Sequence, residues 1–185
     1  GLFGRIGVLS FNGNKTVTTG GGGMLLTMDP ELGARAKHLT TTAKRPHLWE
    51  FFHDETAWNF RLPNVNAALG CAQMERIAEI LADKRALAAA YREFCTGRTD
   101  LEFVDQPAGC LSNFWLCSVR APGLAARDEL LAETNKRGIM TRPLWRLMTD
   151  LPMYAGCLQD NLNAAREAVE RVLSLPSGPR GGKRP

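Results

Sequence analysis

One lysine in a polar, glycine-rich loop is the residue of this chain best suited to covalent chemistry. Lys15 follows Ser-Phe-Asn-Gly-Asn at residues 10–14, and four glycines come after it at residues 20–23. A lysine amine attacks a carbonyl group when a confined site lowers its pKa. A hydroxyl such as that of Ser10 and the bare N–H groups of a glycine run can hold a phosphate. An amine nucleophile beside a phosphate cradle suggests pyridoxal phosphate (PLP), bound to Lys15 as a Schiff base.

Two plainer interpretations of this loop stay open from the residues alone. A lysine between glycine and asparagine is commonly a solvated turn residue, and consecutive glycines commonly form a flexible hairpin. A nucleotide-binding P-loop is excluded, because that motif needs G-x-x-x-x-G-K-[ST], whereas Asn14 separates Gly13 from Lys15 here. The glycine run also follows the lysine instead of preceding it.

Apolar runs on both sides of the loop predict the elements that position it. Residues 6–9 predict a buried strand, and residues 24–27 predict a second strand. Asp29 and Pro30 predict the start of a helix, with Asp29 as its N-cap, and this helix is expected to run through Ala43.

The rest of the chain predicts short strands interspersed with helices. An aromatic-rich loop is expected at 45–63, followed by one long helix or two helical segments at 64–94. Further strands are expected at 101–104, 114–119 and 139–141, and further helices at 125–137 and 163–173. This order predicts an α+β lobe after the end of an α/β domain.

Composition excludes several classes of function. The chain is 44% hydrophobic and 23% charged, as in ordinary globular proteins. No apolar run approaches the roughly 18–20 residues that span a membrane. The five cysteines form neither a C-x-x-C pair nor a zinc-ligand spacing, so we expect no metal, reduced thiols and a cytoplasmic location. A net charge of +4 without a basic helix face indicates neither a nucleic-acid nor a membrane partner.

Four segments of the chain, taken in order, resemble the DegT/StrS-type sugar aminotransferases, which are PLP enzymes of fold type I. The segments are SFNGNKTVTTGGGGMLLT at 10–27, HDETAWNFRLPNVNAALGCAQMERI at 53–77, RGIMTRPLWRLMTDLPMY at 137–154 and SLPSG at 174–178. The resemblance covers nearly the whole chain. It implies an α/β fold of that type, here the end of the large domain followed by a smaller α+β C-terminal domain.

The resemblance also implies domain limits. Residues 1–63 would end the PLP-binding large domain, 64–94 would bridge the domains, 95–178 would form the small domain, and 179–185 would be a disordered basic tail. Family members are longer and carry the lysine segment near their middle. The chain is therefore expected to be the C-terminal half of such an enzyme.

The family's motifs place a second group of candidate residues at 53–61. Asn59 matches an asparagine that reaches the PLP phosphate of the neighbouring subunit, which implies a homodimer. Arg61 is a candidate for binding a carboxylate or diphosphate, with an interface ion pair as an equal alternative. His53 and Trp58 are candidates for lining the sugar pocket, or else for filling the interface.

Three further positions are assigned from the same motifs. Ser10 matches the family's phosphate-binding serine. Arg142 and Trp145 match positions near the mouth of the active site, although a core anchor of the small domain is the favoured alternative for Trp145. The family often has a histidine where this chain has Asp150, so no role is assigned there.

The reaction implied by the resemblance moves an amino group from glutamate to a nucleotide-linked 4-keto-6-deoxysugar. The motifs are most similar to enzymes of the legionaminic acid and perosamine type. Related dehydratases carry histidine in place of the lysine, so Lys15 favours aminotransfer. Two other functions stay open: a truncated fragment without activity, and a regulatory protein that senses a ligand with the PLP fold.

Overall fold

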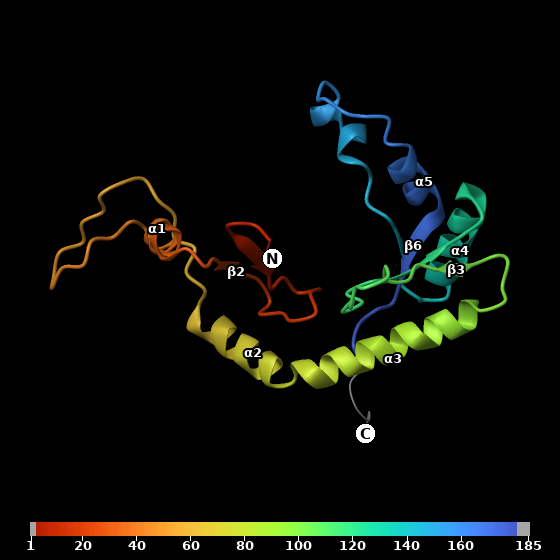
Figure 1. The fold of residues 1–185 in the computed structure, drawn as a ribbon, viewed down its shortest axis with the longest axis horizontal. Helices are drawn as coiled ribbons and strands as arrows, with labels where there is room; N and C mark the ends of the chain where they lie inside the picture. Colours follow the sequence, from red (N-terminus) through yellow and green to blue (C-terminus); the bar gives the residue numbers. More distant parts are fainter. Residues whose placement is uncertain (1–2, 181–185) are drawn as a thin grey trace. The chain divides into compact units, whose positions relative to one another are not determined.

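A computed structural model describes residues 3–180, and its contacts divide the chain into two compact units, Gly1–Ala78 and Glu79–Pro185 (Figure 1). The domain limits expected at residues 63, 94 and 178 remain predictions. Residues 181–185 of the expected tail lie outside the described part. Among the described residues, no helix is both long and apolar enough to cross a membrane.

The first unit begins with an antiparallel hairpin that carries the lysine loop. Strand β1 (Gly7–Ser10) pairs with β2 (Gly23–Leu26), so that Ser10 lies opposite Gly23. Both strands were predicted, but the expected burial of residues 6–9 is wrong. Val8 is 70% exposed, because it lines an open pocket and is not covered by a packed layer.

Helix α1 (Pro30–Thr40) begins where the sequence predicts it. The Asp29 carboxylate accepts two hydrogen bonds of 3.0 Å from backbone N–H groups of the first turn, and Pro30 is the first helical residue. The helix ends three residues before Ala43, the predicted end. Thr42 and Ala43 adopt left-handed backbone conformations (φ 69° and 47°), which end the helix and redirect the chain.

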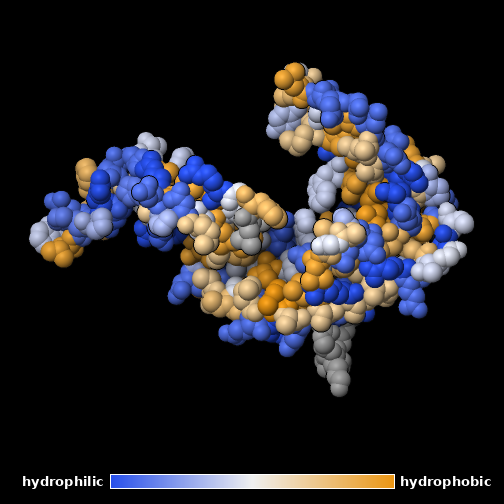
Figure 2. Space-filling view, viewed as in Figure 1, coloured by the Kyte–Doolittle hydropathy of each residue, from blue (hydrophilic) through white to orange (hydrophobic). Residues whose placement is uncertain are grey.

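Residues 41–60, which we call the arm, form an extended excursion with two antiparallel branches (Figure 1). Bridges between Thr41 and Asn59 and between Lys44 and His53 hold the branches together. Figure 2 shows hydrophobic residues at the far end of the arm. Among the side chains of the arm, Leu48 is 89% exposed and Phe51 is 79% exposed. The predicted loop is therefore an ordered, partly apolar projection.

Helices α2 (Asn64–Glu75) and α3 (Ile77–Cys95) correspond to the two-segment alternative predicted for 64–94. Arg76 separates them, with backbone angles (φ −107°, ψ 9°) that interrupt the helix. The boundary between the two units falls shortly afterwards, between Ala78 and Glu79.

The second unit is built around an antiparallel sheet with strand order β3-β4-β6-β5. The strands are β3 (Glu102–Phe103), β4 (Cys117–Arg120), β5 (Arg142–Pro143) and β6 (Val172–Leu175). Helices α4 (Leu124–Lys136) and α5 (Asn163–Arg171) accompany the sheet, with short 3-10 helices η1 (Met148–Asp150) and η2 (Pro152–Tyr154) between β5 and α5. This is the α+β arrangement predicted for the lobe.

Two strand predictions in this unit were wrong. The central strand β6 was assigned to a helix at 163–173, because Val172 and Leu173 continue the apolar spacing of α5. The strand expected at 139–141 lies further along, at Arg142–Pro143, where it pairs with β6.

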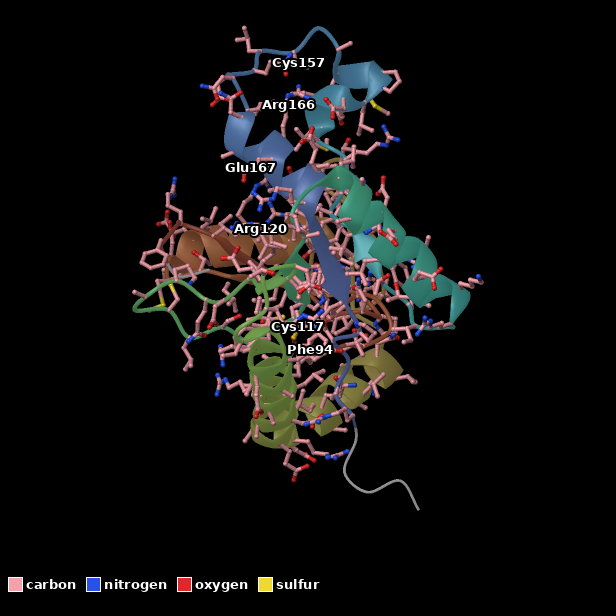
Figure 3. All side chains as sticks on the ribbon, turned by 90° about the vertical axis from the view of Figure 1, so that its right-hand side faces the viewer. Phe94, Cys117, Arg120, Cys157, Arg166 and Glu167 are labelled. Carbon is pink, nitrogen blue, oxygen red and sulfur yellow. The ribbon has the colours of Figure 1, made fainter. Side chains whose placement is uncertain are left out.

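The core of the second unit lies between α3 and the sheet. Its buried members are Ala88, Cys95, Phe103, Phe114, Cys117, Val119 and Leu173. Figure 3 shows Cys117 of β4 beside α3. Cys95 and Cys117 are buried thiols, and burial raises the pKa of both.

A buried lysine connects α3 to the segments around the sheet. Lys84 is 3% exposed and donates hydrogen bonds from Nζ to the carbonyl oxygens of Trp115 (3.3 Å) and Ser177. Ser177 Oγ in turn accepts a 2.7 Å hydrogen bond from the backbone N–H of Cys117. Burial lowers the pKa of Lys84. The SLPSG segment therefore has a structural role, because it supplies partners for a buried cation.

Candidate active site

Lys15 lies in the loop between β1 and β2, in a backbone fixed by local hydrogen bonds. Its N–H donates to the Asn12 carbonyl oxygen (3.0 Å), and the Thr19 N–H donates to the Phe11 carbonyl oxygen (3.0 Å). The Lys15 side chain is half-buried. Ser10 Oγ, at the end of β1, accepts a hydrogen bond of 3.4 Å from the Asn12 N–H. Lys15 and Ser10, the two residues first singled out from the sequence, thus each have a hydrogen bond with Asn12.

Close packing explains two glycines of the run at 20–23. A Cβ on Gly23 would lie 2.7 Å from the Leu9 carbonyl oxygen, and a Cβ on Gly22 would lie 2.6 Å from Leu62 Cδ1. Gly22 also has a φ of 112°, a conformation that favours glycine. A Cβ on Gly21, in contrast, would meet no atom within 4 Å. The run is a packed turn, so the flexible-hairpin interpretation does not describe it.

Contacts with α2 that sequence reasoning missed hold the lysine loop in place. The Thr18 N–H donates to Gln73 Oε1 (2.9 Å), and Asn66 Nδ2 donates to the Thr19 carbonyl oxygen (2.5 Å). Gly70 lies between these two helix residues, and a Cβ there would come within 3.0 Å of the Thr19 side chain. The only sequence signal is the spacing of Asn66, Gly70 and Gln73, which places them on one side of a helix.

Trp58, Asn59 and Arg61 lie together at the base of the arm. The Trp58 N–H donates to the Leu39 carbonyl oxygen (3.0 Å), and Asn59 forms a bridge with Thr41. Arg61 donates from Nη2 to the Thr41 carbonyl oxygen (3.4 Å). Contacts with α1 and with the start of the arm therefore hold Trp58, Asn59 and Arg61 in place. The Lys15 loop, in contrast, is held by contacts with α2.

His53 lies further along the arm and has a structural contact. Its Nδ1 donates a 2.6 Å hydrogen bond to the Thr42 carbonyl oxygen, across the bridge that joins the two branches. This bond ties the imidazole ring to the backbone and uses one of its two nitrogens, Nδ1.

An ion-pair network attaches the arm to α1. His38 Nε2 lies 2.7 Å from Asp54 Oδ1, and Arg45 Nε lies 2.5 Å from Asp54 Oδ2. Glu55 binds the Arg35 guanidinium through both oxygens. Ligand atoms of His38, Asp54 and Glu55 come within 4.8 Å of one another, as in a metal site. Because each carboxylate already binds an arginine, we assign the cluster as an ion-pair network.

Acid is expected to release the arm from α1. The Arg35 guanidinium lowers the pKa of Glu55, and the hydrogen bond from His38, with Arg45 nearby, lowers the pKa of Asp54. Carboxyl groups of this kind stabilise fully above their ordinary values of 3.8 and 4.5, and the stabilisation is lost as the pH falls through the folded-state pKa. The NMR amide signals of Thr42 and Trp58 should therefore lose dispersion below about pH 4.

The double variant Asp54→Asn, Glu55→Gln should show this loosening already at pH 7 and should have no acid step. Asp160→Asn, at an exposed position outside the network, serves as the matched control and should behave as the parent chain does. An arm whose signals are unchanged in the double variant would contradict the assigned network.

A pocket of about 720 Å³ opens beside the hairpin. It is lined by β1, β2, α1 and residues 60–63, including Arg61 and several apolar side chains such as Val8 and Leu25. Lys15 and Ser10 are not among its lining residues. The pocket is therefore next to the lysine loop in the fold but is not the lysine site itself.

Arg142 belongs to the second unit and is held at the end of α4. Its Nη1 donates to Asn135 Oδ1 (3.2 Å) and to the Thr141 carbonyl oxygen (3.1 Å). Trp145 is 67% exposed and stacks on Trp115, so its interpretation as a core anchor is wrong.

Asp150, the position where the chain departs from the family's pattern, has an ion-pair partner. Its Oδ1 lies 3.2 Å from Nη1 of Arg166 on α5, and Figure 3 shows Arg166 beside the segment that carries η1. This contact joins η1 to α5 and gives Asp150 a structural role.

The groups around Lys15 fit a cofactor that carries an aldehyde and a phosphate. The Thr16 hydroxyl, next to Lys15, is buried and has no hydrogen-bond partner in the described part of the chain. An unsatisfied buried hydroxyl costs about 1–3 kcal/mol, so a ligand oxygen at this point would be stabilising. With Lys15, Ser10 and the glycine run, this hydroxyl completes a donor set suited to PLP.

The fold is that of an aminotransferase. It matches the crystal structure of the aminotransferase TlmJ from Streptoalloteichus hindustanus with a TM-score of 0.90 and 28% sequence identity, over 99% of this chain and 49% of that one. The sequence profile of the DegT/DnrJ/EryC1/StrS aminotransferase family matches residues 1–183, and the chain belongs to this family. The predicted fold class, the α/β fold of type I aminotransferases with a smaller α+β part, is confirmed.

The chain is also similar in sequence to two curated bacterial proteins. EpsN of Bacillus subtilis (strain 168), named as a candidate pyridoxal phosphate-dependent aminotransferase, is 34% identical over 96% of this chain and 47% of its own length. The GDP-perosamine synthase of Escherichia coli O157:H7 is 31% identical over 97% of this chain and 48% of its own length. The chain thus spans about half the length of the curated relatives it matches.

Proposed function

We propose that the chain is part of a PLP-dependent aminotransferase, which moves an amino group from glutamate to a nucleotide-linked 4-keto-6-deoxysugar. The observation that carries this proposal is Lys15, held in a packed loop that also contains the buried, unpartnered hydroxyl of Thr16 and that begins at Ser10. Membership of the aminotransferase family supports the reaction class. The similarity to a GDP-perosamine synthase supports the class of sugar substrate.

The residues of this chain would divide the work of the reaction among them. Bound PLP supplies an electron sink at the carbon that gains or loses the amino group. Lys15 would hold the cofactor through Nζ and, after the donor amine displaces it, would carry the proton between substrate and cofactor carbons. Ser10 and Thr16 would donate hydrogen bonds to phosphate oxygens. The contacts with α2 would keep the lysine aligned, which lowers the entropic part of the barrier.

Four residues are proposed for the substrate side of the reaction. The Arg61 and Arg142 guanidinium groups suit the carboxylate of the amino donor or the diphosphate of the sugar nucleotide. His53 and Trp58 would contribute to the sugar site from the arm.

A homodimer in the cytoplasm completes the proposal. Asn59 would reach the cofactor phosphate of the second subunit. The exposed aromatic side chains of the arm support this arrangement, because contiguous apolar surface of this kind commonly becomes buried in an interface.

Covalent labelling tests the proposal. The chain is incubated with PLP and reduced with borohydride, and mass spectrometry is then expected to find the cofactor on the peptide that contains Lys15. Lys15→Ala should lose this label, whereas Lys136→Ala, at an exposed position on α4, should retain it. In a version of the protein with the full length of its relatives, Lys15→Ala should lower the transamination rate by about 10²–10⁴-fold.

The two lengths of protein separate the possible failures. A label that appears on Lys15 only in the longer version would assign the short chain to a non-catalytic fragment. A label in the longer version that does not depend on Lys15 would overturn the proposal.

A further inference from the structure

The second unit contains a pocket of about 870 Å³ between α3 and α4. Tyr91 and Phe94 of α3 line one side of the pocket, and Leu130 of α4 lines another. The central strands β4 and β6 contribute Val119 and Leu175. Every residue that lines the pocket belongs to this unit. A volume of this size is in the range of roughly 300–1,000 Å³ that small-molecule sites occupy.

The walls of the pocket are held by the fold itself. Val119 is 1% exposed, and its strand β4 is paired with β3 on one edge and with β6 on the other. Leu130 packs against the buried core of the unit. The Tyr91 hydroxyl donates a 2.9 Å hydrogen bond to the Pro176 carbonyl oxygen, which fixes the ring. A ligand therefore loses little binding free energy to the ordering of these side chains.

Apolar surface remains open to water around the pocket. Phe94 is 59% exposed, and Ile139, which also lines the pocket, is 46% exposed. Displacing water from apolar surface is favourable in proportion to the area that becomes buried. The pocket therefore favours a ligand with a bulky apolar body.

The charged side chains that line the pocket are predominantly acidic. Arg98 is neutralised by Asp100, which accepts hydrogen bonds of 2.9 and 2.5 Å from Nε and Nη2. Glu129 and Glu133 lie one turn apart on α4. Glu133 has an arginine 3.5 Å away, Arg137. The Glu129 carboxylate, in contrast, has no hydrogen-bond or ion-pair partner in the described part of the chain.

An apolar pocket with an unpaired carboxylate suits a ligand that combines an apolar body with one positive charge. An anion of the same shape would meet the acidic lining, and a neutral molecule would gain nothing from Glu129. We propose that this pocket binds a hydrophobic amine, with its apolar body against Tyr91 and Phe94 and its ammonium group on the Glu129 carboxylate. None of the lining residues has a part in the proposed aminotransfer, so this site is independent of the proposed function.

Three compounds with one apolar body test the site by NMR titration of the chain. They are 3,3-diphenylpropylamine, 3,3-diphenylpropanol and 3,3-diphenylpropionic acid, which at neutral pH are positive, uncharged and negative. The amine is expected to bind saturably and to shift the amide signals of Val119, Ala126 and Leu130. Because an ion pair with an exposed carboxylate is weak, the amine should bind about two- to fivefold more tightly than the alcohol. The acid should bind more weakly than the alcohol.

The role of the charge is tested at Glu129. Glu129→Gln should lower the affinity for the amine to that for the alcohol and should leave the alcohol unaffected. Glu170→Gln is the matched control, because Glu170 is exposed on α5 and does not line the pocket. This control should keep the preference for the amine. In the parent chain the preference should shrink at high salt.

The role of the apolar wall is tested at Phe94. Phe94→Ala should weaken the binding of all three compounds by about threefold or more, because apolar contact area is lost. Phe51→Ala, which removes an exposed phenylalanine from the arm, should change nothing. Since both side chains are mostly exposed, each variant should unfold thermally as the parent chain does.

Three results would rule this site out. The first is that the amine, at millimolar concentration, causes no saturable shifts or only shifts away from the pocket. The second is that the alcohol or the acid binds as tightly as the amine. The third is that Glu129→Gln keeps the preference for the amine that the parent chain shows.

Discussion

Replacing Leu173 by alanine is expected to lower the free energy of unfolding of the second unit by about 2–5 kcal/mol. Leu173 is 0% exposed and lies on the central strand β6, opposite Val119 of β4. It belongs to the buried cluster that joins the sheet to α3. Truncation leaves a cavity between these elements, and strands paired on both edges cannot move together to fill it.

Urea denaturation followed by circular dichroism measures this loss. Leu158→Ala is the matched control, because Leu158 is 102% exposed and its truncation should change stability by less than about 0.5 kcal/mol. Equal stability of the two variants would mean that β6 does not occupy the centre of the core.

Replacing Gly23 by alanine is expected to destabilise the hairpin by about 1–3 kcal/mol and to reduce the PLP label on Lys15. The new Cβ would lie 2.7 Å from the Leu9 carbonyl oxygen, so a backbone segment has to move. This displacement shifts β2 relative to β1, and the lysine loop is the connection between these two strands.

Hydrogen exchange of the β1 and β2 amides, together with borohydride labelling, measures both effects. Gly21→Ala is the control, because Gly21 lies in the same run and a Cβ there would meet no atom within 4 Å. This control should retain the label and the protection of the amides. If the two alanine variants behave alike, the packed turn does not position Lys15.

Local sequence signals predicted the elements that depend on neighbouring residues. Asp29 and Pro30 marked the start of α1, because an N-cap and a first-turn proline act within one helical turn. β6 was missed, because Val172 and Leu173 suit the apolar spacing of the preceding helix as well as a strand. Only pairing with β4 and β5, which are distant in sequence, decides between the two.

In the candidate site, too, local signals were predicted and contacts between distant residues were not. Lys15 and Ser10 were found from the loop that contains them, but the residues that hold this loop were not. Thr18 binds Gln73 across 55 positions and Thr19 binds Asn66 across 47, so no local spacing joins these partners. The Trp115–Trp145 pair was missed for the same reason, since its members are brought together only when the sheet forms.

The position of β6 has a consequence for synthesis on the ribosome. Of the four strands in its sheet it is the last to be made, yet β4 and β5 pair with it and not with each other. β4 can pair with β3 earlier, but β5 cannot join the sheet until residues 172–175 have left the exit tunnel. The hydrogen bond from Lys84 to the Ser177 carbonyl oxygen, 93 residues away, forms later still. The sheet of the second unit is therefore expected to close only after residues 172–177 have been made, with contacts of long sequence separation that slow this step.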